Sequence, residues 1–387
     1  MINARLTLAS LFCLLALSAC SIDIGQTASP TPSPNATVAV TPTASGAASQ
    51  TQSNTLGNPA LPTFTIPVTW GDLKLTGKLV YTMSGQDGNV PYMRIQLLDL
   101  ATGAGSTIFQ APQNGFIYFA SVSPDSKTLV MAYSAPAGAN LSSHQELYSL
   151  PLDGSTPPQL LFMPPTPDDE YFQPAWSPDG KYLYFTHVNF HDAPSIPKQH
   201  YPIYTIYRMA YPGGQPQKLA DQAYWPRLSW DSSHLAYVSL NPLDGKNNLF
   251  VANADGTNPQ NVSQASQGMS DIIDAPMFTP DNGSILFSAV VPTQSAAATW
   301  WEKLLGVTVA SAHTVPSDWW SIPLSGGTPK QLTHINAVGL FASPSPDQQY
   351  LASYSGGGIF VMKPDGTQST ILVNDVGGQP GTVTWIP

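Results

Sequence analysis

The chain has 387 residues, of which 10% are charged, and a formal net charge of −10. The acidic excess and the lack of Lys and Arg clusters exclude nucleic acid as an expected partner, because binding a polyanion requires clustered positive charge. Composition does not separate an enzyme from a binding protein, so the order of motifs along the chain carries the functional argument.

Residues 1–19 have the features of a secretory signal peptide. Arg5 precedes an apolar run at residues 6–17, which is too short to span a bilayer. The sequence Leu17-Ser18-Ala19-Cys20 resembles the lipobox of bacterial lipoproteins, in which the Cys becomes the lipid-modified first residue. An ordinary signal peptide with a chance Cys is the alternative. We expect an exported protein, anchored through lipid on Cys20 at the periplasmic or extracellular face of the cell envelope.

Residues 20–63 are predicted to be a disordered, lipid-anchored tether. Ser, Thr, Pro, Ala and Gly dominate this segment, and aromatic or charged side chains are almost absent. Such a composition cannot bury enough apolar surface to offset the entropy of ordering. The alternating Pro residues between Ser29 and Pro34 favour extended conformations, so the tether is expected to be a semi-stiff spacer.

Residues 64–387 form short apolar segments separated by Gly, Pro, Asp and Asn, which predicts an all-β domain. The clearest repeated unit begins at Trp176-Ser177-Pro178-Asp179-Gly180. Pro and Asp favour a tight turn there, and Gly tolerates the left-handed position. Similar corners recur at Ser123-Pro124-Asp125, Ser229-Trp230-Asp231, Thr279-Pro280-Asp281 and Ser345-Pro346-Asp347. Each corner is predicted to join two strands, and a third strand, a second turn and a short outer strand follow.

Four strands per unit, repeated about every fifty residues, are typical of β-propeller blades. Five complete units cover residues 116–373, and the sixth is split. Residues 382–387 match an innermost strand, residues 77–82 match the strand that should follow it, and residues 93–100 and 106–109 supply the other two. The predicted fold is a six-bladed β-propeller whose ring is closed by a blade shared between N-terminal and C-terminal strands, which removes exposed edges.

The W-S-P-D-G-K-x-L pattern of Trp176 to Leu183, with its partial copies, resembles the WD40-like (PD40) repeats of the TolB-type propeller family. The resemblance covers about residues 75–387 and implies that partners or ligands use one mouth of the channel. TolB itself has an α/β domain before its propeller, where this chain has a tether, so a role in the Tol system is not implied. Related propellers precede hydrolase domains in peptidases, but this chain contains no Gly-x-Ser-x-Gly nucleophile elbow.

Residues just before the innermost strands are expected to lie near one mouth of the channel. They are Gln173, Tyr224, Trp225, Arg227 and Asp274. We predict a site for a protein or cell-envelope glycan there, with ordinary solvated rim residues as the alternative. Because most Asp residues lie in turns, no pair of carboxylates for acid–base catalysis is visible, and the scaffold is predicted to be non-catalytic and without a cofactor.

An insertion in the second blade, residues 187–200, contains His187, His191 and His200. Together with Asp192 these imidazoles are suitable ligands for a divalent metal. Related propeller lyases hold a metal through His, so the alternative function is a metal-dependent, lyase-like polysaccharide-active enzyme. The segment has no His-Glu-x-x-His spacing and no Cys, which favours a solvated polar loop instead.

An insertion in the fourth blade, residues 292–318, contains a predicted helix at residues 295–305. Its aromatic and apolar side is formed by Trp300, Trp301, Leu304 and Leu305. We expect these residues to pack against the propeller, and a helix that faces a partner or a membrane is the alternative.

Overall fold

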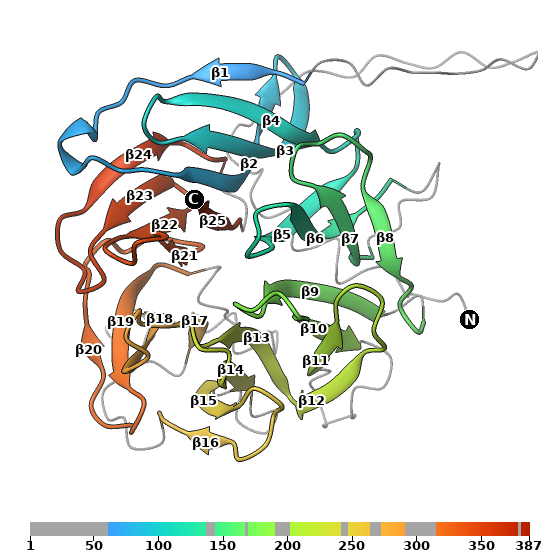
Figure 1. Cartoon of the computed structure of the whole chain (residues 1–387), viewed down its shortest axis with the longest axis vertical. Coiled ribbons are helices and arrows are strands. Elements are labelled where there is room, and N and C mark those ends of the chain that lie inside the picture. The colour runs from blue at the N-terminus through green and yellow to red at the C-terminus, as the bar shows by residue number, and fades with distance from the viewer. Residues whose placement is uncertain are drawn as a thin grey trace, which may run out of the picture. The chain divides into compact units, whose positions relative to one another are not determined.

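The computed structural model describes residues 61–136, 144–166, 169–189, 202–240, 247–263, 272–290, 315–377 and 381–387. The chain divides into two compact units, Met1–Pro59 and Ala60–Pro387, and all described residues belong to the second. They form six antiparallel sheets arranged in a ring, which confirms the predicted six-bladed β-propeller (Figure 1). Among the described residues, no helix has the length and apolar character that a membrane crossing requires.

Blades 1 to 5 follow one another along the chain, and in each blade the first strand is the innermost (Figure 1). Blade 1 contains β5 (Phe116–Val122), β6 (Thr128–Ser134), β7 (Glu146–Pro151) and β8 (Gln159–Phe162). Blade 2 contains β9 (Asp169–Trp176), β10 (Tyr182–Asn189), β11 (Ile203–Ala210) and β12 (Gln217–Asp221). Blade 3 contains β13 (Ala223–Leu228), β14 (His234–Leu240), β15 (Asn247–Asn253) and β16 (Gln260–Asn261). Blade 4 contains β17 (Ile273–Phe278), β18 (Ser284–Val290), β19 (Ser317–Pro323) and β20 (Lys330–Gln331), and blade 5 contains β21 (Phe341–Pro344), β22 (Leu351–Ser355), β23 (Gly358–Met362) and β24 (Thr370–Asn374).

Blade 6 joins the two ends of the propeller. Its strands, from the axis outward, are β25 (Val383–Ile386), β2 (Lys78–Asp87), β3 (Val90–Asp99), β4 (Ala104–Gln110) and β1 (Thr63–Thr65). Lys78 pairs with Ile386 and Tyr81 with Val383, so the predicted split blade is confirmed. The outer strand β1 was not predicted, because three residues are too short for a periodic pattern. A 3₁₀ turn, η1 (Gly71–Leu73), lies between β1 and β2.

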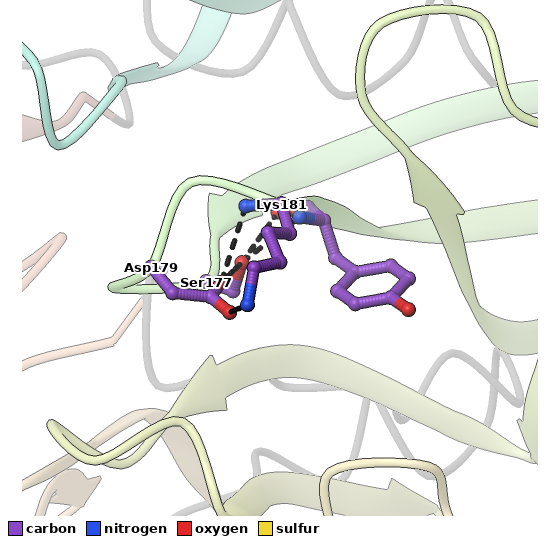
Figure 2. Close-up of polar contacts among 4 residues, drawn as sticks. Ser177, Asp179 and Lys181 are labelled. Carbon is purple, nitrogen blue, oxygen red and sulfur yellow. Dashed lines mark hydrogen bonds and ion pairs between the residues drawn. The ribbon is translucent and has the colours of Figure 1, made fainter.

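The Ser-Pro-Asp corners are hydrogen-bonded turns (Figure 2). In blade 2 the Ser177 hydroxyl donates to Asp179 Oδ1 (2.7 Å) and accepts from the Tyr182 amide (2.9 Å), while the Lys181 amide donates to Asp179 Oδ1 (3.1 Å). The hydroxyl-to-carboxylate bond recurs in blades 1, 3, 4 and 5 at Ser123–Asp125, Ser229–Asp231, Thr279–Asp281 and Ser345–Asp347. Hydrogen bonds from the hydroxyl hold the pKa of Asp179 below its ordinary value. These carboxylates therefore stabilise turns.

The middle of the second strand of each blade is buried on both faces and mainly apolar, because each blade is covered by a neighbour on either side. In β6 the side chains from Leu129 to Tyr133 are all buried, and in β18 those from Ile285 to Val290 are buried. A mainly apolar run of this length is typical of a strand with no solvated face. The propeller core therefore consists mainly of contacts between blades.

Candidate functional site

One position recurs in the innermost strand of blades 1 to 5, and directly before that of blade 6, and forms a layer around the ring axis. In blades 1 to 5 this position lies six residues before the turn Asp. Blade 6 has no turn Asp, but Trp385 corresponds there to Trp176 of blade 2. The position in blade 6 is therefore three residues before Trp385, as Gln173 is three residues before Trp176. We call these residues the axial layer: Phe119, Gln173, Trp225, Ala275, Phe341 and Thr382. Blades 1, 3 and 5 contribute aromatic side chains and blades 2, 4 and 6 contribute smaller ones.

The three aromatic residues meet across the axis. The ring centroid of Trp225 lies 5.1 Å from that of Phe119 and 6.0 Å from that of Phe341. Because these residues belong to blades that are not neighbours, the contacts span the centre of the ring. Trp225 is only 2% exposed, and Phe119 and Phe341 are also buried. The axial layer therefore fills the channel at this level.

Three axial residues lie at irregularities inside their strands. Gln173, Trp225 and Ala275 have φ values of +52°, +59° and +48°, and each is followed by Pro. The register with the second strand shifts beside each of them. Pro has no N–H to donate to a ladder and is tolerated at such a bulge. The predicted placement before the innermost strands was therefore wrong: all five predicted residues lie within β9, β13 or β17.

Hydrogen bonds connect four of the five predicted residues. Gln173 Oε1 accepts from the Thr186 hydroxyl (2.8 Å) and from the Trp225 amide (2.9 Å), and Trp225 Nε1 donates to Asp274 Oδ1 (3.1 Å). Asp274 is fully buried and also accepts a hydrogen bond from the Tyr224 hydroxyl. Burial of Tyr224 raises its pKa well above the ordinary value. These contacts run from blade 2 through blade 3 to blade 4 and hold the blades together.

A cavity of about 390 Å³ lies next to the axial layer and is lined by residues of all six innermost strands. We call it the channel cavity. The position two residues beyond the axial layer lines it in every blade: Ser121, Ala175, Arg227, Met277, Ser343 and Thr384. Most of these side chains are small, which leaves the space open. Pro124, Pro178 and Pro346 of the turns also line the cavity, so it lies toward the face that carries the Ser-Pro-Asp corners.

Arg227 is the one charged side chain among the residues that line the channel cavity. Its guanidinium carbon lies 4.5 Å from the centroid of the Phe341 ring, and Nη1 donates to the Pro226 carbonyl (3.4 Å). It forms no ion pair with any residue that the structure describes. Burial lowers the pKa of Arg227 to about 10, so the group stays charged at neutral pH. The cavity thus combines an unpaired cation with an aromatic wall.

A second hollow, of about 400 Å³, lies between blades 2 and 3 and contains Arg208. This guanidinium is already held in place. It donates to Gln217 Oε1 (3.2 Å) and to the Ala254 carbonyl (3.3 Å), and it lies 5.0 Å from the Tyr182 ring centroid. The channel cavity therefore offers the more available positive charge.

His187 does not belong to an insertion, as the sequence suggested, but to strand β10. The β10 backbone continues its pairing with both neighbouring strands through Asn189. His187 Nε2 lies 3.1 Å from Asp169 Oδ1 at a side-chain exposure of 12%. His191 and His200 lie outside the described residues. Within the described ranges, no three or more side chains of His, Cys, Asp or Glu are grouped so that they could hold a metal ion. The three-His metal site stays a prediction.

Other predicted sites also lie outside the part of the chain that the structure describes: Cys20, Trp300, Trp301, Leu304 and Leu305. Conversely, the sequence interpretation missed Phe119 and Phe341, although counting six residues back from each turn Asp would have found both. It also did not single out Glu170, which is 8% exposed in β9. Burial raises the pKa of Glu170 to about 7.

Comparisons with known proteins agree with a propeller fold. No protein-family model matches the sequence, and no curated protein sequence matches it. A putative TolB from Agrobacterium tumefaciens is 16% identical over 81% of this chain and 99% of its own, with a TM-score of 0.48. A nidogen/laminin complex structure gives 11% identity over 79% and 97% of the two chains, with a TM-score of 0.54. Kuenenia stuttgartiensis hydrazine synthase is 12% identical, and the match covers 81% of this chain and 47% of that chain, with a TM-score of 0.55. The two matches with TM-scores above 0.5 agree with the class of fold that the six sheets define, a β-propeller.

Proposed function

We propose that this protein is a cell-envelope lipoprotein whose propeller is a non-catalytic scaffold that binds a protein or a cell-envelope glycan. The observation that carries the proposal is how the polar groups near the axis are used. Gln173, Trp225 and Asp274 connect neighbouring blades, and the Asp residues of the five corners hold their own turns. Asp274 and the corner Asp residues are thus engaged in holding blades and turns, and this rigidity suits a recognition scaffold.

Attachment to the envelope rests on the lipobox-like sequence before Cys20 and the polar tether after it. It is tested by metabolic labelling with a fatty acid and by membrane fractionation of the wild type and Cys20→Ala. We expect label and membrane association for the wild type only, because Cys20 supplies the thiol that carries the lipid. Equal labelling of the two proteins, or a wild type recovered in the soluble fraction, contradicts the anchor.

Recognition is tested by crosslinking on intact cells, followed by immunoprecipitation and by co-sedimentation with purified cell-wall material. Trp385→Ala weakens ring closure, whereas Ile371→Ala removes an apolar side chain that is 57% exposed on the outer strand β24. We expect the wild type and Ile371→Ala to recover one specific protein or to sediment with the glycan, and Trp385→Ala to lose this binding. If wild type and Trp385→Ala give the same background recovery in both assays, the scaffold function is wrong.

A further inference from the structure

The channel cavity has the size and chemical character of a small-molecule site. Its volume of about 390 Å³ falls within the range of pockets that hold small organic ligands. Trp176, Phe278 and Phe341 contribute aromatic surface to its lining. The axial layer lies against it and fills the ring axis there, so this cavity is a blind pocket and not part of an open pore.

No side-chain carboxylate from the described part of the chain lines the channel cavity. Arg227 is charged at neutral pH, is partly withdrawn from water, and has no carboxylate partner among the described residues. Its equivalents in the other blades are Ser121, Ala175, Met277, Ser343 and Thr384, none of which is charged. A partly desolvated guanidinium gains most from an anion that accepts two parallel hydrogen bonds, as a carboxylate does.

The surroundings of the cavity favour a single negative charge. The five corners on the same face carry Asp125, Asp179, Asp231, Asp281 and Asp347. These carboxylates repel anions near the entrance, and the repulsion grows with the charge of the incoming ligand. The single positive charge of one guanidinium neutralises one carboxylate. A phosphate dianion or a dicarboxylate would keep one negative charge without a partner. The side chains of Ser121 and Thr384 form no hydrogen bond with a described residue and remain available to a second polar group of the ligand.

The geometry points to the channel cavity as a binding site for a small organic monocarboxylate with a flat, apolar body. Arg227 holds the carboxylate, and the aromatic and proline walls hold the body. This site goes beyond the proposed scaffold function, because it needs neither membrane attachment nor a macromolecular partner.

The test is isothermal titration calorimetry of the purified full-length protein with benzoate, benzamide, phthalate and inorganic phosphate. Benzamide keeps the shape of benzoate without its charge, whereas phthalate and phosphate carry more charge. We expect saturable binding of benzoate, at least 10-fold weaker binding of benzamide, and phthalate and phosphate weaker than benzoate. Absence of saturable benzoate binding, equal binding of benzamide, or tighter binding of either more highly charged anion overturns the proposal.

Variants locate the site. Arg227→Met should weaken benzoate binding at least 10-fold, and Arg227→Lys should retain part of it, because Lys keeps the charge but loses the planar fork. Arg208→Met is the matched control in the hollow between blades 2 and 3, and its benzoate affinity should stay within about 2-fold of wild type, since a charge in a separate hollow is screened by salt. Circular dichroism and thermal melting check folding. Wild-type affinity for benzoate in both Arg227 variants overturns the assignment. If a variant does not fold, the proposal is tested instead by comparing benzoate and benzamide binding to the wild-type protein.

Discussion

Replacement of Trp385 by Ala tests whether blade 6 holds the ring closed. Trp385 lies in β25, is 6% exposed, and its Nε1 donates to the Thr76 carbonyl (2.9 Å), while its amide donates to Ser343 Oγ of blade 5 (3.0 Å). A buried Trp replaced by Ala typically costs about 3–5 kcal/mol, because both apolar burial and packing are lost. Trp385→Phe keeps a ring and loses the indole hydrogen bond, so its cost should be nearer 1 kcal/mol.

The assay is urea unfolding followed by far-ultraviolet circular dichroism, with a second probe to check that the transition is cooperative. Trp230→Ala serves as the control, because its side chain is 36% exposed and its loss should cost about 1–2 kcal/mol, less than the loss of Trp385. The expected order of stability is wild type, Trp230→Ala and Trp385→Phe close together, then Trp385→Ala. If Trp385→Ala and Trp230→Ala unfold at the same urea concentration, β25 does not secure the ring and the reasoning is refuted.

Three further predictions concern pH, the turns and metal. Burial raises the pKa of Glu170 from 4.5 to about 7, so the folded state holds this proton more tightly, and stability should fall by up to about 3 kcal/mol between pH 4.5 and pH 7. Glu170→Gln should therefore melt like the wild type at pH 5 and above it at pH 8, and equal differences at both pH values would argue against a buried neutral Glu170. Ser177→Ala should lower the free energy of unfolding in urea by about 1–3 kcal/mol, because it unpairs the Tyr182 amide. Lys181→Ala removes only an exposed ion pair and should lower it by less than about 1 kcal/mol. Similar values for the two variants would contradict the turn geometry. Elemental analysis of the purified protein should find only substoichiometric divalent metal, and chelation should leave its melting temperature unchanged; a stoichiometric metal would instead support the His187, His191 and His200 site.

The sequence predicted the fold well because turn chemistry is local. A Ser or Thr two residues before an Asp defines each corner within four residues, and five such corners at a regular spacing define blades. The pairing of Lys78 with Ile386 also followed, since each terminal segment matched one strand of the same unit. The short strand β1 had no periodic signal and was not expected.

The candidate site was harder to predict because it depends on residues from six separate strands. The position of Trp225 relative to the axis depends on a bulge, and a left-handed φ at Trp is not suggested by local propensity. The channel cavity exists because five distant positions carry small or unbranched side chains around Arg227, a feature that appears only when the blades are superimposed. Sequence reasoning selected Arg227, but the placement it assumed was incorrect.

The axial layer has a lower symmetry than the ring that surrounds it. Aromatic residues on blades 1, 3 and 5 alternate with smaller residues on blades 2, 4 and 6, so the interior repeats after two blades. Transplanting a single blade would place two bulky rings beside each other or leave a void, and both faults are costly in a packed interior. Moving two neighbouring blades together preserves the filling. For the engineering of this ring, the unit of exchange is therefore the blade pair.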